Sequence, residues 1–147
     1  IIKNPRESKL INATKVSGRT AKGLGIGVLN AVTNTRYATL EDDITKEQRQ
    51  VIVDPLTNYS VIVLDQTMKN NSSVSLINTN VWRSGNDYDA NVTAALFSLN
   101  DKKNTWNVSG KAAFSSLIGY LPDGKTQKGY SHNVFMGKTS GLKSCLL

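Results

Sequence analysis

The stretch TWNVSGKAAFSS, residues 105–116, decides the fold class because its side chains alternate between two kinds. Trp106, Val108, Ala112 and Phe114 fall on one face of an extended strand, and Lys111 falls on the other with small polar residues. An aromatic residue at each end of a short apolar stripe is typical of a strand that faces lipid in a transmembrane β-barrel. The stretch therefore predicts a β-strand whose two faces meet different surroundings.

Similar segments recur along the whole chain, separated by turn residues. Alternation and strand-favouring composition predict seven strands, at 9–19, 24–40, 59–68, 73–83, 89–100, 104–116 and 128–138. Most of them are longer than an ordinary globular strand and near the roughly 9–11 residues that a tilted strand needs to cross a bilayer. We predict an all-β fold, an antiparallel up-and-down meander.

The links between these strands differ in length in a regular way. Three are tight and three are longer: 20–23, 69–72 and 101–103 against 41–58, 84–88 and 117–127. Tight and long links alternate, as in barrels whose hairpins turn tightly on the periplasmic side and loop on the outside. Within 41–58 we expect one helical turn with Asp43 as its N-cap.

The glycine-rich stretch SGRTAKGLGIGVLNAVT, residues 17–33, suggests at first a loop that holds phosphate. Such a loop is followed by a helix, whereas here Lys22 precedes the glycines and a strand-forming run follows them. We therefore interpret the stretch as a hairpin that turns at Lys22-Gly23. Alternation before the turn places Lys15 and Arg19 on one face.

Composition excludes several classes of partner. The net charge is +7, from 18 basic and 11 acidic residues, but the basic residues are scattered. A nucleic-acid surface needs them clustered, so we expect no nucleic-acid partner. Cys145 is the one cysteine, which argues against a disulfide framework and a thiolate metal site. We expect no cofactor and no metal.

Candidate catalytic groups do not form a recognisable constellation. His132 is the one histidine, and the adjacent Ser131 points to the opposite face of the same predicted strand. A triad would need another serine and a distant carboxylate such as Asp65 or Asp89. The acidic run 41–43 is interpreted as a solvated loop, because it lacks the spaced ligands of a calcium loop. These residues argue against an enzyme and assign no catalytic residue.

Four groups of residues resemble a family of Gram-negative outer-membrane proteins. They are KVSGR at 15–19, NNSSVSLINTN at 70–80, DAN at 89–91 with LNDKKNTWNVSGK at 99–111, and GYSHNVFMGKTSG at 129–141. In that family a module similar to a family-9 carbohydrate-binding domain precedes a C-terminal barrel of unassigned function. The resemblance implies an outer-membrane location and a link to a carbohydrate or another envelope ligand. It carries over no catalytic residue.

Together these features predict that residues 1–147 form a single partial domain, a fragment of a transmembrane β-barrel truncated at both ends. The chain lacks an initiator Met, and its ending GLKSCLL lacks the terminal aromatic residue common in such barrels. We expect it to contact outer-membrane lipid and the remainder of the same barrel, and to admit a glycan or small ligand. Lys15, Arg19 and Lys111 are the candidate lumen-facing residues.

Two alternatives stay open at this point. Runs such as SVIVLD, residues 60–65, are apolar on both faces, so a soluble antiparallel sheet acting as a binding module fits them equally well. A secreted hydrolase domain is the other alternative hypothesis, and its catalytic residues would have to include Asp65, Asp89 or His132.

Overall fold

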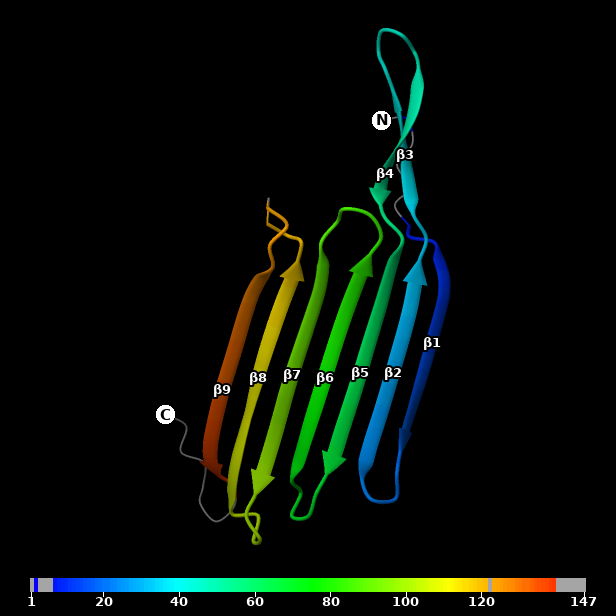
Figure 1. Ribbon diagram of the computed structural model, residues 1–147. Helices are drawn as coiled ribbons and strands as arrows, with labels where there is room; N and C mark the ends of the chain where they lie inside the picture. The colour runs from blue at the N-terminus through cyan, green and yellow to red at the C-terminus, as the bar shows by residue number, and fades with distance from the viewer. Residues whose placement is uncertain (1, 3–6, 122, 140–147) are drawn as a thin grey trace.

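The computed structural model describes residues 2, 7–121 and 123–139 (Figure 1). This part of the chain forms nine strands: β1 Leu10–Arg19, β2 Leu24–Thr33, β3 Arg36–Glu41, β4 Gln48–Asp54, β5 Thr57–Thr67, β6 Ser73–Arg83, β7 Asp89–Asn100, β8 Trp106–Ile118 and β9 Gln127–Lys138. No helix that could cross a membrane occurs in these residues. The prediction of an all-β antiparallel meander is confirmed.

Seven strands lie side by side in one sheet, in the order β1-β2-β5-β6-β7-β8-β9, and every neighbouring pair is antiparallel (Figure 1). Strands β3 and β4 form a separate hairpin, which projects beyond one end of the sheet between β2 and β5. The sheet is open within the described residues, because β1 and β9 are its two edges and do not pair with each other. A closed barrel is therefore not part of the observed fold.

The three tight turns lie together at one end of the sheet, which we call the tight-turn end (Figure 1). Residues with positive φ close them: Gly23 at 84°, Asn70 at 58°, Asn71 at 53° and Asn104 at 51°. Glycine and asparagine are the residues that adopt this conformation most readily. In the β7–β8 turn, the Asp101 carboxylate accepts hydrogen bonds from the backbone N–H groups of Thr105 and Trp106, and those bonds hold the pKa of Asp101 below its usual value.

Directly paired residues of an antiparallel sheet point to the same face, so the register assigns every strand residue to one of two faces. One face carries Arg19 and Arg83, and we call it the arginine face. The other carries Trp82 and Trp106, and we call it the tryptophan face. The end opposite the tight turns, where the longer links lie, is called the long-link end.

The sheet is a single layer with no core of its own. Among the described residues only Ala38, Thr57 and Ser72 are buried, whereas large apolar side chains are exposed on most strands. In water an apolar surface of this extent is unfavourable, and one layer of strands cannot cover its own faces. The fold therefore requires something outside these residues to cover the sheet.

Two predicted elements are wrong. The strand expected at 24–40 ends at Thr33, and β3 begins at Arg36 as part of the separate hairpin. The break lies at Asn34, whose side-chain oxygen accepts a hydrogen bond from the Thr35 backbone N–H and turns the chain out of the sheet. Arg36 then pairs with Asp54 across the hairpin.

The helical turn expected after Asp43 is also absent. Residues 43–45 form the turn of the β3–β4 hairpin, and the link expected at 41–58 contains strand β4. The carboxylate that caps the turn belongs to Asp42, which accepts hydrogen bonds from the backbone N–H groups of Ile44 and Thr45. These bonds lower the pKa of Asp42. Cys145, on which the argument against disulfides and a thiolate metal site rests, lies outside the described residues. So does the ending GLKSCLL, on which the expected truncation of the barrel rests in part.

Candidate functional site

The tryptophan face is apolar in the half of the sheet next to the tight turns. Trp106, Phe114, Ile62 and Leu76 are each between 45% and 48% exposed on it. We call this surface the apolar band, and its members are Ile26, Val28, Ile62, Leu64, Val74, Leu76, Phe97, Leu99, Trp106, Val108, Ala112, Phe114, Tyr130, Val134 and Met136. These side chains extend across six strands, β2 and β5–β9. His132, opposite Ala112, lies within the band, and Lys138, opposite Trp106, lies at its edge beside the tight turns.

Asparagine side chains replace the apolar ones on the same face toward the long-link end. Asn30 donates to Asn58 at 2.6 Å, and Asn78 donates to Thr93 at 2.8 Å and to Asn91 at 3.2 Å. We call this group the asparagine band; its further member is Asn80, to which Asn91 donates at 3.3 Å. Because the amides bond mainly to one another, the boundary between the two bands is a row of satisfied polar groups.

The arginine face has the opposite distribution. Beside the tight turns it carries a row of directly paired residues that crosses all seven strands: Arg19, Gly25, Asp65, Ser75, Leu96, Lys111 and Asn133. Toward the long-link end the same face becomes mainly apolar, with Leu29, Val61, Val81, Val92 and Leu117. Lys15, opposite Leu29, and Arg83 are the charged residues that the register also places there. The sheet is thus amphipathic in both halves, but in opposite senses.

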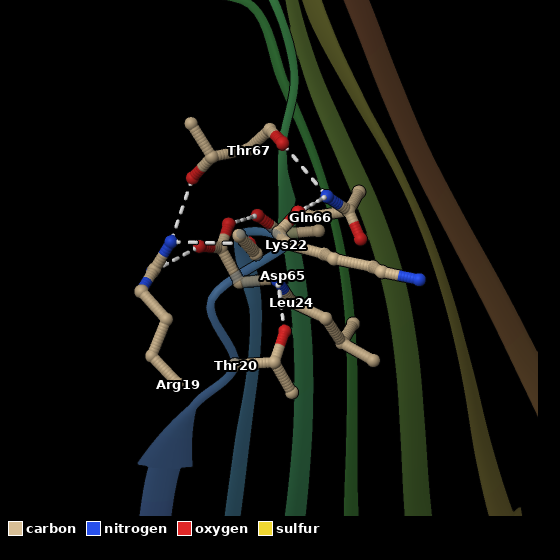
Figure 2. Close-up of polar contacts among 9 residues, drawn as sticks. Arg19, Thr20, Lys22, Leu24, Asp65, Gln66 and Thr67 are labelled. Atoms are coloured by element: carbon tan, nitrogen blue, oxygen red, sulfur yellow. Dashed lines mark hydrogen bonds and ion pairs between the residues drawn. The ribbon is translucent and has the colours of Figure 1, made fainter.

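Arg19 is held in place by three side-chain and backbone contacts (Figure 2). Its guanidinium forms an ion pair with Asp65 at 2.5 Å, donates to the Thr67 hydroxyl at 2.6 Å and donates to the Gly23 carbonyl at 3.3 Å. Asp65 also accepts a hydrogen bond from Ser75 at 2.7 Å. The Arg19 charge is therefore neutralised on the sheet itself.

Lys111 lies in a different environment on the same row. It is directly paired with Leu96 and Asn133, and no carboxylate of the described residues lies within ion-pair distance of its ammonium group. Asp65 is three strands away, about 14 Å at the usual strand spacing, which is too far for a contact. A shallow hollow of about 380 Å³ beside Lys111 is lined by Ser73, Ser75, Leu96, Ser98, Ser109, Asn133 and Phe135, among others.

The structure thus places the three predicted site residues on one face. Arg19 and Lys111 share a row, about 24 Å apart across five strand spacings, and Lys15 lies four residues from Arg19 on the same face of β1. They are not in contact with one another. That this face lines a lumen remains a prediction. Sequence reasoning did not identify Asp65 and Thr67 as partners of Arg19, because these contacts join residues more than 40 positions apart. It also did not identify Ser75 as the partner of Asp65.

The candidates for a hydrolase do not converge. His132 lies on the tryptophan face and stacks on Tyr130, with ring centroids 6.3 Å apart, while Ser131 lies on the arginine face. Asp65 lies on the arginine face and Asp89 on the tryptophan face at the long-link end. Among the described residues no three histidine, cysteine or acidic side chains are arranged to hold a metal ion.

Alternation in β7 places its most regular apolar stripe on the arginine face. Ala94 and Leu96 of that stripe pair with Ala113 and Lys111 of β8, whereas Phe97 lies on the tryptophan face over Gly110. The two apolar stripes in the sequence of β7 and β8 therefore point in opposite directions. Only the register shows that the two stripes lie on opposite faces of the sheet. The sequence of each strand by itself shows one apolar face but not which face of the sheet it belongs to.

Comparison with known proteins gives a family without an assigned activity. No curated protein and no solved structure matched the chain. One family model matches residues 1–145, and its description is "Domain of unknown function (DUF5916)". Since the match covers nearly the whole chain, the chain belongs to the DUF5916 family of domains of unknown function.

Proposed function

We propose that this chain is a wall segment of a transmembrane β-barrel in an outer membrane. In this arrangement the apolar band of the tryptophan face contacts lipid, and the row from Arg19 to Asn133 on the arginine face lines the interior. The observation that carries the proposal is the single-layer sheet, with a large apolar band on one face and Arg19, Asp65 and Lys111 on the other. A barrel wall needs no second layer, because lipid covers its outer face.

The height of the apolar band fits a membrane. On β8 it extends from Trp106 to Phe114, eight residue spacings or about 27 Å along the strand. A tilt of about 40° shortens this to about 21 Å along the membrane normal, comparable to the roughly 25 Å of lipid-facing surface in outer-membrane barrels. Trp106 marks one boundary, and the directly paired Phe114 and Tyr130 mark the other. Aromatic residues at both boundaries are characteristic of such barrels.

Asn30, Asn58, Asn80 and Asn91 of the asparagine band lie beyond the Phe114–Tyr130 boundary, where the proposal places the outer aqueous phase. Asn78 lies level with that boundary, directly paired with Ile62 and Thr93. Amides there would face water or polar headgroups. An unpaired amide in hydrocarbon costs about 2–7 kcal/mol, and this location avoids that cost. The longer links and the β3–β4 hairpin extend from the same end (Figure 1). Long links on the outside and tight turns on the periplasmic side are the usual arrangement in bacterial barrels.

The two edges of the sheet support continuation of the wall. All ten residues of β1 are exposed, and Tyr130 and Met136 on β9 are 83% and 71% exposed. Unpaired strand edges do not occur in the hydrocarbon region, because their N–H and C=O groups would have no partners. The proposal therefore includes further strands of the same barrel beside β1 and β9.

Fractionation of the full-length protein tests the proposal. We expect it to be recovered with the outer membrane and to migrate differently on gels before and after boiling, since folded barrels resist detergent. A soluble monomer obtained without detergent would contradict the proposal and favour the soluble binding module. Recovery from the membrane without a change in mobility on boiling would contradict the barrel in particular.

A further inference from the structure

We propose that Lys111 and the serine hydroxyls around it bind an anionic group, a phosphate or a carboxylate, on the interior of the barrel. The inference rests on the proposed function for its location and goes beyond it by assigning a site and a ligand class. The site comprises Lys111, Ser73, Ser98, Ser109 and Asn133, contributed by four neighbouring strands, β6 to β9.

The positive charge of Lys111 is uncompensated on the described sheet. The other cation of the same row, Arg19, is paired with Asp65 at 2.5 Å, so the row as a whole keeps one net positive charge, at Lys111. A barrel interior lined by Lys or Arg selects anions. The compensating charge for Lys111 is therefore expected from the solute.

Hydroxyl groups next to Lys111 supply hydrogen-bond donors for an oxyanion. Ser98 and Ser109 are directly paired. Ser109 lies two residues from Lys111 along β8, and Ser98 lies diagonally across from Lys111 on β7. Ser98 accepts a hydrogen bond from Asn107 at 3.0 Å, so its own hydroxyl hydrogen can point to a ligand. Hydrogen bonds between such donors and a charged acceptor are stronger than those between neutral groups.

Apolar side chains flank the site and complete its lining. Leu96 lies directly opposite Lys111, and Phe135 lies opposite Ser109. Together with the hydroxyls they form the hollow of about 380 Å³, large enough for a phosphate or a carboxylate.

Cysteine labelling of the full-length protein tests the site directly. Ser98→Cys is introduced in a cysteine-free background, and the folded protein is labelled in detergent with an anionic or a cationic methanethiosulfonate reagent of similar size. The labelling rate measured with each reagent is divided by the rate at which the same reagent modifies a free thiol in solution. The side chain at 98 is about 7 Å from Lys111. A unit charge at that distance changes each rate by about threefold in water, so we expect the anionic-to-cationic ratio to be raised by about tenfold.

Three further variants identify the source of the preference. Lys111→Gln should return the ratio to about one, and Lys111→Arg should preserve it. Lys103→Gln, which removes the same charge from the β7–β8 turn, should leave it unchanged. Ser109→Cys provides a second labelling position if Ser98→Cys does not fold, with the gel shift on boiling as the check for folding.

The outcomes separate this inference from the proposed function. A protein that folds in the membrane but shows the same ratio with Lys111→Gln would overturn the anion site and leave the barrel intact. A folded protein whose cysteine reacts with neither reagent would also overturn it, because the site would be closed to solutes. A soluble protein would overturn the barrel, whatever the labelling ratio.

Discussion

At the scale of single residues, Gly110 is the described glycine at which an added Cβ would make the shortest contact. An added Cβ would lie 2.6 Å from the Asn133 backbone oxygen and 2.9 Å from the Phe97 ring. The ring can move, but the backbone oxygen belongs to the neighbouring strand β9 and cannot move without separating the strands. The glycine thus permits both the close approach of β8 to β9 and the packing of Phe97 on the tryptophan face.

We therefore expect Gly110→Ala to destabilise the folded full-length protein by about 1–3 kcal/mol, the usual range for overpacking. Gly27→Ala is the matched control on the interior strand β2, since a Cβ added there would meet only the Val63 Cβ, at an ordinary 3.7 Å, and we expect little change from it. Urea unfolding in detergent measures both. Equal stability of the two variants would contradict the close approach of β8 to β9 at Gly110.

At the scale of elements, the sequence predicted the regular strands better than the hairpin between them. The predicted bounds 73–83 and 89–100 coincide with β6 and β7, because turn residues flank both segments. No glycine or proline marks the break at Asn34, and strand-forming residues lie on either side of it. Residues 24–40 were therefore predicted to form one strand. Strand β4, QRQVIVD, alternates weakly at its start and was hidden in a long predicted link.

The β3–β4 hairpin pairs with itself and adds no strand to the seven-stranded sheet. Thr33 and Thr57 are directly paired, so β2 and β5 can be joined by a two-residue turn in place of residues 34–56. We expect a full-length protein with Asn-Gly in that position to keep its gel shift on boiling, because Asn-Gly suits a tight hairpin. Loss of the shift would show that the hairpin contributes to the fold of the sheet.

At the scale of the whole molecule, the site was only partly predictable. Alternation was enough to place Lys15 and Arg19 together, and to separate Lys111 from the Trp106 stripe. The partner of Arg19 was not predictable, because Asp65 reaches it only through the pairing of β1 with β2 and of β2 with β5. The reversal of polarity between the two halves of the sheet likewise depends on the register of all seven strands.

That reversal has a consequence for the barrel as a whole. In the long-link half the arginine face is mainly apolar, with Leu29, Val61 and Val92, while the tryptophan face carries the asparagine band. An apolar surface facing inward above the membrane is stable when packed side chains cover it. The proposal therefore implies an interior filled with protein in the outer half and open to solutes in the half that contains Lys111.

The measurement that tests the central claim most directly compares Ala112→Arg with Ala113→Arg in the full-length protein. The two alanines are adjacent in β8, but Ala112 lies in the apolar band and Ala113 on the arginine face. If the tryptophan face contacts lipid, Ala112→Arg should destabilise the barrel by about 2–4 kcal/mol in urea unfolding from lipid vesicles, and Ala113→Arg should cost far less. Equal costs, or a larger cost for Ala113→Arg, would contradict the assignment of the two faces.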